Sequence, residues 1–236
     1  SEMCIRDSRE DALVIWAARR LQQPVFWTAD RGESFLSDEH ARAVSGTSSL
    51  GLDVDGNFTA LWVDAHVDTG AYLSRRSKGF VNNMGGVAGQ YKTQNISAQI
   101  SFFFTNTMQT SPYRGFGRPE ATYVIERLID QAARETGRDP LALRQQNLIP
   151  AESMPYQTAL TFNYDSGNFP KIVATAAKNA DYAGFAKRRK KSEARGLLRG
   201  IGIANPIEVA GGPLKQLLRR RSFTRSSSCL LYTSPS

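Results

Sequence analysis

The stretch "AVSGTSSLGLDVDGNFTALWVDAHVD", residues 43–68, contains two β-type runs on either side of a turn at residues 55–57. An Asp-Gly pair between two such runs is a strong local signal for a β-hairpin. In the second run, small and aliphatic residues alternate with Trp62, Asp64, His66 and Asp68. Successive side chains of a strand point to opposite faces, so this alternation predicts a sheet with one buried and one polar face.

Helical and β-type patterns alternate irregularly along the rest of the chain. Apolar residues at helical spacing, together with Asp139-Pro140 as a helix start, predict helices over about 9–22, 119–135, 139–148 and 169–190. Apolar runs of strand length predict further strands at 25–28, 95–106 and 196–211. A loop with a short helix is expected between residues 74 and 89. The sequence therefore predicts an α+β fold of mixed antiparallel strands with packed helices.

The composition is that of a globular protein, because 41% of the 236 residues are hydrophobic. A net charge of +8 would normally suggest a nucleic-acid-binding protein. However, the last 24 residues contain five basic side chains and no acidic one, so most of this net charge lies in the tail and does not indicate a nucleic-acid-binding interior. The two cysteines, Cys4 and Cys229, lie near opposite ends, which argues against a disulfide framework or a cysteine metal site. No apolar run is long enough for a membrane span.

The two ends differ in character from the interior. "SEMCIRDS" (residues 1–8) and "CLLYTSPS" at the other end resemble translated sequencing-adaptor read-through. The Arg- and Ser-rich run before the second of these is typical of a shifted reading frame. We therefore expect residues 1–8 and 213–236 to be artefacts, and residues 9–212 to form part of one domain.

The segment "SPYRGFGRPE", residues 111–120, is the main candidate site. Gly115 and Gly117 permit positive φ angles and a close approach of the backbone. Arg114 offers a cation with several donors, which suits phosphate or a polar heterocycle. The start of the helix after Gly117 favours an anion, and the ring of Phe116 could stack on a flat molecule. From the residues alone, a tight loop that joins a strand to a helix remains the simpler interpretation.

Three separated motifs resemble one known family. They are "QPVFWTADRGESFLSD" at 23–38, "DVDGNFTALWVDAHVDTGAYLS" at 53–74, and "PYRGFGRPEATYVIERLIDQAARETGRDPLALRQQNLIP" at 112–150. In order and spacing they are similar to the molybdopterin-binding large subunit of the xanthine dehydrogenase and aldehyde oxidase family. The resemblance covers about residues 9–212.

This resemblance implies a molybdenum hydroxylase that uses oxygen from water to oxidise an aldehyde or an N-heterocycle. Arg114, Gly115 and Gly117 would face the molybdopterin cofactor, which is expected in its dinucleotide form, and Phe116 would contact a planar substrate. Iron–sulfur clusters and FAD would be carried by partner subunits or domains, and the protein would be oligomeric. A cytoplasmic location is expected, with the periplasm left open.

Several departures from the family pattern narrow the expected chemistry. Carbon monoxide-oxidising relatives hold copper on a cysteine where this chain has Gly115. Purine-oxidising relatives carry a substrate-side arginine that falls near Asn82 here. The catalytic glutamate of the family would lie beyond Gly212, so no catalytic residue is assigned. The chain is expected to be an interior fragment, inactive by itself.

Two other functions are alternatives to the enzyme. A nucleic-acid-binding module would use Lys187–Lys191 and the basic tail, and a non-catalytic scaffold would keep the fold but tolerate larger residues at Gly115 and Gly117. The spacing of His40 and His66 argues against a metal pair. Asp64, His66 and Asp68 are more simply explained as a solvated strand face than as metal ligands.

Overall fold

The computed structural model describes residues 9–73 and 79–207, without the side chains of Arg9 and Asn82. The predicted hairpin is confirmed: β1 (Val44–Leu52) pairs antiparallel with β2 (Phe58–Asp68). The Asp53 carboxylate fixes the turn, because it accepts hydrogen bonds from the backbone N–H groups of Asp55 and Asn57 at 3.0 and 2.8 Å. A hydrogen bond from the Asn57 side chain, followed by these backbone bonds, lowers the pKa of Asp53.

The third strand, β3 (Asn95–Phe103), pairs in parallel with β2, so the strand order is β1-β2-β3. A parallel pair needs a crossover, and this one runs through α4 (Gly79–Met84) and the 3₁₀ helix η1 (Gly85–Ala88). The α+β class is therefore confirmed, with one antiparallel and one parallel pair in the main sheet.

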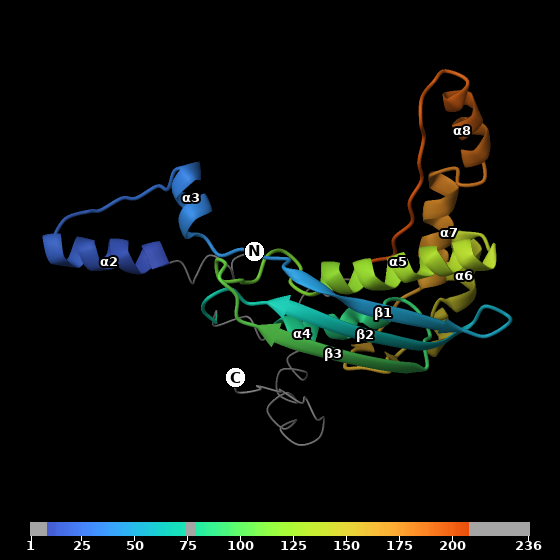
Figure 1. Ribbon diagram of the computed structural model, residues 1–236, viewed down its shortest axis with the longest axis horizontal. Helices are drawn as coiled ribbons and strands as arrows, with labels where there is room; N and C mark the ends of the chain where they lie inside the picture. The colour runs from blue at the N-terminus through green and yellow to red at the C-terminus, as the bar shows by residue number, and fades with distance from the viewer. Residues whose placement is uncertain (1–8, 74–78, 208–236) are drawn as a thin grey trace.

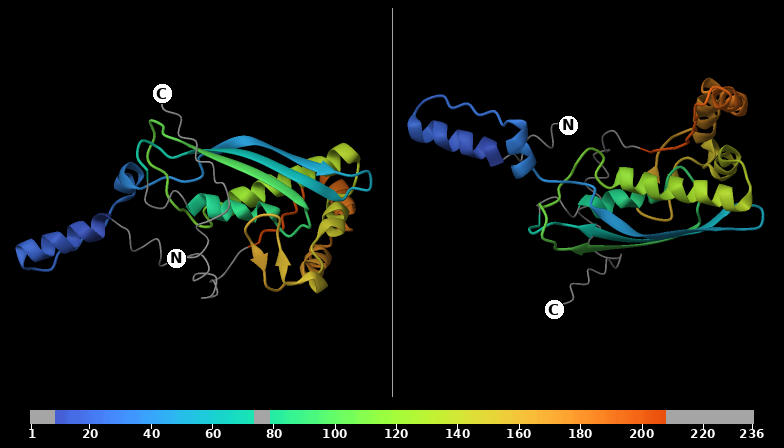
Figure 2. Two further views of the ribbon diagram at one scale, coloured as in Figure 1. Left: turned by 90° about the horizontal axis from the view of Figure 1, so that it is seen from below. Right: turned by 45° about the horizontal axis from the view of Figure 1, so that its top comes forward.

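Helix α5 (Arg118–Thr136) lies along one face of this sheet, and α4 lies on the same side (Figures 1 and 2). The side chains that meet between these layers are buried, as the alternation in β2 predicts. From the sheet and α5 they are Leu61, Val63, Ala65, Val67, Ala121, Ile125 and Ile129. The predicted stripe on α5 is partly correct, because Ile129 and Ala132 are buried while Val124 and Leu128 are only partly so.

A buried ionic cluster connects α5 to α6 (Pro140–Asn147), the helix predicted to begin after Asp139. The Arg144 side chain is fully buried, and its Nε donates to Glu126 Oε2 at 2.8 Å. Its Nη2 donates to Asp130 Oδ1 at 2.8 Å. The Tyr91 hydroxyl donates to Glu126 Oε1 at 2.7 Å, and burial raises the pKa of Tyr91 strongly. This cluster satisfies charges that would be costly if buried alone.

The extended segment from Ile203 to Ile207 passes beside this cluster. The carbonyl of Ile203 accepts from Arg144 Nη2 at 3.2 Å, and Asn205 Nδ2 donates to the Tyr91 hydroxyl at 3.1 Å. The carbonyl of Pro206 accepts from Gln90 Nε2 at 3.1 Å. The described part of the predicted last strand, up to residue 207, is thus extended but belongs to no sheet. Residues 208–211 of that prediction lie outside the described residues.

Two arms extend from opposite ends of the sheet (Figure 1). One contains α2 (Arg9–Leu21) and α3 (Arg31–Ser37). The helix at 9–22 is confirmed, but Trp16 on its apolar side is 61% exposed. The strand predicted at 25–28 is wrong: within the described part of the chain this stretch has no strand partner, and Phe26 is 90% exposed.

The other arm follows η2 (Ala151–Ser153) and the short antiparallel strands β4 (Tyr156–Gln157) and β5 (Asn163–Tyr164). The long helix predicted at 169–190 is two helices, α7 (Phe169–Asn179) and α8 (Phe185–Glu193). The break lies at residues 180–184, where Asp181 has a φ of 46°. No helix in the described ranges is both long and apolar enough to cross a membrane.

Candidate functional site

The candidate loop connects β3 to α5, and its first part is fixed against the end of β2. Thr110 N–H donates to the Thr69 carbonyl at 3.1 Å, and the Thr110 hydroxyl donates to the Asp68 carbonyl at 2.9 Å. The Asp68 carboxylate accepts from the Thr105 hydroxyl and from Gly70 N–H. Those two bonds, the Thr105 bond first, lower the pKa of Asp68. The end of β2 thus positions the segment that leads into the loop.

Three consecutive residues of the loop have positive φ angles. They are 88° at Gly115, 24° at Phe116 and 90° at Gly117. A Cβ atom at Gly115 would lie 2.8 Å from the Pro119 ring, and one at Gly117 would lie 2.8 Å from the Phe80 carbonyl oxygen. The glycines are therefore required by the packing of the chain against itself. A non-catalytic scaffold with this fold would therefore also need glycine at both positions. The size of the residues at positions 115 and 117 thus does not distinguish such a scaffold from an enzyme.

The side chain of Phe116 packs against the start of α4. Its ring is half-buried and meets the Phe80 ring edge-on, with centroids 5.7 Å apart. Its carbonyl accepts from Asn83 Nδ2 at 2.6 Å. One side of the ring thus packs on the core, while part of it remains exposed.

Arg114 differs from Phe116 because its side chain is exposed. Within residues 9–73 and 79–207, its guanidinium has no hydrogen-bond or ion-pair partner. Its carbonyl accepts from Arg42 Nη2 at 2.5 Å. The backbone at this position is therefore fixed, while the cationic side chain keeps all its donors available.

The backbone amides at the start of α5 are largely used within the chain. Gly117 N–H donates to Glu120 Oε2 at 2.9 Å, and Arg118 N–H donates to the Gly115 carbonyl at 3.2 Å. Pro119 has no N–H group. The expectation that the free amides of this helix end would hold an anion is therefore wrong for the amides of Gly117 and Arg118. The helix begins at Arg118, one residue before the predicted start.

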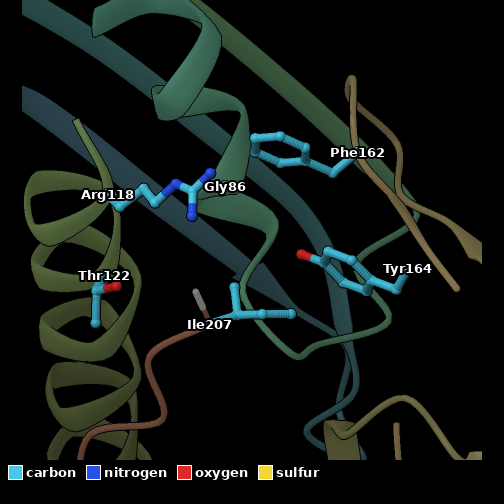
Figure 3. A pocket seen from close by; sticks show the side chains of 6 residues that line it. All are labelled: Gly86, Arg118, Thr122, Phe162, Tyr164 and Ile207. Atoms are coloured by element: carbon cyan, nitrogen blue, oxygen red, sulfur yellow. The ribbon is translucent and has the colours of Figure 1, made fainter. Parts of the chain in front are cut away.

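A pocket lies beside the loop, under Arg118 (Figure 3). Arg118 and Thr122 of α5 line one side, and Phe162 and Tyr164 line the other. Ile207 lies between the two sides, and Gly86 of η1 completes the lining. The Arg118 guanidinium lies 6.0 Å from the centre of the Phe162 ring. The Tyr164 hydroxyl donates to the Gly89 carbonyl at 2.7 Å, and burial raises the pKa of Tyr164.

A groove crosses the other, polar face of the sheet, lined by Ala43, Val44, Ser45, His66, Asp68, Phe103 and Thr105. His66 Nε2 lies 3.6 Å from Asp64 Oδ1, and the Asp68 carboxylate is occupied by Thr105 and Gly70. No cluster of metal-ligating side chains occurs among the described residues.

Comparison with known proteins decides the family. A family model described as the molybdopterin cofactor-binding domain matches residues 5–148. The chain belongs to this family. The resemblance inferred from the three sequence motifs is thus confirmed, and the nucleic-acid-binding alternative is not favoured.

Several curated relatives of this molybdopterin cofactor-binding domain are similar over most of its length. The 6-hydroxypseudooxynicotine dehydrogenase complex subunit gamma of Paenarthrobacter nicotinovorans is 31% identical over 86% of this chain and 26% of its own. The carbon monoxide dehydrogenase large chain of Afipia carboxidovorans is 33% identical over 81% of this chain and 25% of its own. The chain therefore spans about a quarter of the length of these relatives.

Solved structures show the same fold. Quinoline 2-oxidoreductase from Pseudomonas putida 86 superposes with a TM-score of 0.71 and 30% identity, covering 79% of this chain and 24% of that one. The Cu,Mo-CO dehydrogenase superposes with a TM-score of 0.68 and 29% identity, covering 78% of this chain and 24% of that one. The α+β architecture is therefore that of part of a molybdopterin-binding subunit.

The loop residues fit a molybdopterin in one specific respect. Arg114 presents a guanidinium whose N–H groups have no partner within the described residues, and such a group suits phosphate and carbonyl oxygens. Gly115 and Gly117 shape the turn that carries Arg114 and Phe116, and a Cβ at these two positions would meet Pro119 and Phe80, respectively. Asn82 lies in α4, but its side chain is outside the described structure.

Arg42, which contacts the loop, was not predicted as a site residue. Glu120 lay within the predicted candidate segment 111–120 but was given no role, although it accepts from Gly117 N–H. That role could have been found, because a glutamate at the third position of a helix is a common capping signal. Arg42 lies 72 residues before Arg114, and no local pattern connects the two.

Proposed function

We propose that this domain belongs to the large subunit of a molybdenum-dependent hydroxylase that oxidises an aldehyde or an aromatic N-heterocycle with oxygen from water. The observation that carries the proposal is the family match over residues 5–148. The Arg114 guanidinium, which has no partner among the described residues and lies on a loop of fixed backbone, supports it. We take the extent of the domain as residues 9–212.

An N-heterocycle is the favoured substrate class of the two. Two relatives are named for such molecules, quinoline and 6-hydroxypseudooxynicotine. The Cu,Mo-CO dehydrogenase is named for copper as well as molybdenum, whereas this chain has Gly115, without a thiol, at the position expected for a copper-binding cysteine. A copper-dependent reaction is therefore not proposed.

Each residue of the loop has a proposed role. When bound, molybdopterin supplies the redox chemistry that replaces a substrate hydrogen by oxygen from water. Arg114 would donate hydrogen bonds to polar oxygens of the cofactor, and the turn at Gly115 and Gly117 would hold this arginine in place. Phe116, packed on one side by Phe80, would offer its remaining surface to a planar substrate and restrict its orientation.

We further propose the dinucleotide form of the cofactor, iron–sulfur and flavin groups on partner subunits or domains, an oligomeric assembly and a cytoplasmic location. The relatives' names, "complex subunit gamma" and "large chain", are those of proteins in multi-subunit enzymes. The general base would come from a part of the large subunit outside these residues.

The proposal is tested on the full-length large subunit, expressed with its partner subunits in a host that makes molybdenum cofactor. We expect one molybdenum per large subunit by elemental analysis. With quinoline, benzaldehyde or carbon monoxide as substrate and ¹⁸O-labelled water as solvent, mass spectrometry should find the label in the quinoline or benzaldehyde product. A protein without molybdenum, or oxidation of carbon monoxide alone, would contradict the proposal.

A further inference from the structure

Arg42 lies outside the loop, in the segment that leads into β1, yet three of its contacts reach the loop and the start of α5. Its Nη1 donates to Glu120 Oε1 at 3.0 Å. Its Nη2 donates to the Arg114 carbonyl at 2.5 Å. Its guanidinium carbon lies 5.1 Å from the centre of the Tyr113 ring, within the range of a cation–π contact. One side chain thus contacts residues 113, 114 and 120.

Glu120 extends this set of contacts to the glycine turn. While Oε1 accepts from Arg42, Oε2 accepts from Gly117 N–H at 2.9 Å. The side chain of Glu120 is only 12% exposed, and that of Arg42 is 34% exposed. Charge-assisted hydrogen bonds in such a partly desolvated position are stronger than those of a fully exposed ion pair. Arg42 and Glu120 therefore restrain both ends of the turn, at Arg114 and at Gly117.

The backbone at Arg42 is unusual in a way that favours a specific role. Its φ angle is 68°, a conformation that is costly for a residue with a Cβ atom. Two neighbouring interactions maintain it. His40 N–H donates to the Gln109 carbonyl at 3.0 Å, and Ser111 N–H donates to the His40 carbonyl at 2.9 Å. The segment before β1 is thus attached to the segment before the loop, and the turn at Arg42 directs its side chain to Tyr113.

We propose that Arg42 is a positioning residue that acts with Glu120 to hold the backbone of residues 114–117. It does so without contacting cofactor or substrate. The Arg114 side chain has no protein partner of its own in the described structure, so its position depends on its backbone, and that backbone depends on Arg42. The inference rests on the proposed function, because it assigns Arg42 the task of aiming Arg114 and Phe116.

The first test measures trypsin cleavage of the Arg114–Gly115 bond in the full-length subunit, followed by mass spectrometry. This readout requires neither cofactor nor activity. We expect Arg42→Gln to accelerate cleavage at this bond about fivefold or more, because local opening controls the access of the protease. Arg42→Lys, which keeps the positive charge but lacks the planar fork of the guanidinium, should give an intermediate rate. Arg189→Gln is the matched control, since Arg189 also donates to a glutamate at 3.0 Å but lies on α8.

Two further results separate positioning from a general loss of stability. The double variant Arg42→Gln/Glu120→Gln should be cleaved no faster than the more affected single variant, because residues that act as one unit are not additive. In loaded enzyme, Arg42→Gln should lower kcat/KM about tenfold more than Arg189→Gln does, with melting temperatures alike for the two variants.

The outcomes also distinguish this inference from the proposed function. If Arg42→Gln and Arg189→Gln show the same cleavage at Arg114 and the same kcat/KM, the positioning role of Arg42 is wrong, even in a molybdenum enzyme. If the full-length protein contains no molybdenum but Arg42→Gln still accelerates cleavage, Arg42 restrains the loop and the proposed function fails.

Discussion

Arg144 and Glu126 form an ion pair inside the protein, with Nε and Oε2 2.8 Å apart and the arginine side chain fully buried. We predict that Arg144→Met lowers the free energy of unfolding by about 3–5 kcal/mol, because the Glu126 carboxylate would stay buried without its partner. Urea unfolding measures this value. Arg189→Met, which removes an exposed ion pair on α8, should cost about 1 kcal/mol or less. Equal losses in the two variants would contradict the importance of the buried cluster.

Gly117→Ala is predicted to destabilise the fold by about 2 kcal/mol or more. The added Cβ would meet the Phe80 carbonyl oxygen at 2.8 Å, at a φ angle of 90°. Gly137→Ala is the matched control, because Gly137 also has a positive φ, of 67°, but nothing lies within 4 Å of the added atom. That variant should cost only about 1 kcal/mol. Urea unfolding of both variants isolates the effect of the contact, and similar losses would show that Phe80 does not matter.

Arg114→Ala is predicted to weaken cofactor binding without changing stability. The guanidinium has no hydrogen-bond or ion-pair partner among the described residues, so its removal should shift the melting temperature by less than about 1 °C. Loss of its hydrogen bonds to a charged group should reduce affinity by about 1.5–3 kcal/mol. Molybdenum retained by the full-length enzyme during dialysis measures this effect. If Arg114→Ala keeps its molybdenum as well as the wild type does, Arg114 is not a cofactor ligand.

Asp68 is predicted to stabilise the fold fully above about pH 4 and progressively less as the pH falls below that value. Its pKa is lowered by hydrogen bonds to the charged form, first from Thr105 and then from Gly70 N–H, so the folded state favours the ionised carboxylate. That stabilisation is present above the pKa of the unfolded chain and is lost as pH falls through the lower folded value. The difference in unfolding free energy between wild type and Asp68→Asn should therefore shrink from pH 6 to pH 3. A difference that stays constant over this range would contradict the prediction.

Local patterns predicted most of the central fold. The hairpin of β1 and β2, the start of α6 at Asp139 and the extent of α5 all follow from turn, capping and periodicity signals within a few residues. Errors occurred where partners decide the structure. Residues 25–28 have a strand-like composition but meet no neighbouring strand, and the parallel partner of β2 depends on a crossover that no local signal specifies.

The candidate site divides in the same way. The loop at Arg114–Gly117 was found from its residue types and the family motif, and its positive φ angles agree with the glycines. The contact of Gly117 with Phe80 was not predictable, because Phe80 lies in another part of the chain. The Arg42–Glu120 pair spans 78 residues, so only a three-dimensional structure connects them.

The extended segment at Ile203–Pro206 has a practical consequence for anyone who shortens this protein for expression. Its carbonyls accept from Arg144 and Gln90, and Asn205 donates to Tyr91, so three buried polar side chains depend on it. Truncations that end after residue 207 should leave solubility unchanged, whereas one that ends at Gly202 should yield mainly insoluble protein. Secondary-structure content alone would have placed a safe boundary at the end of α8, where the last helix stops.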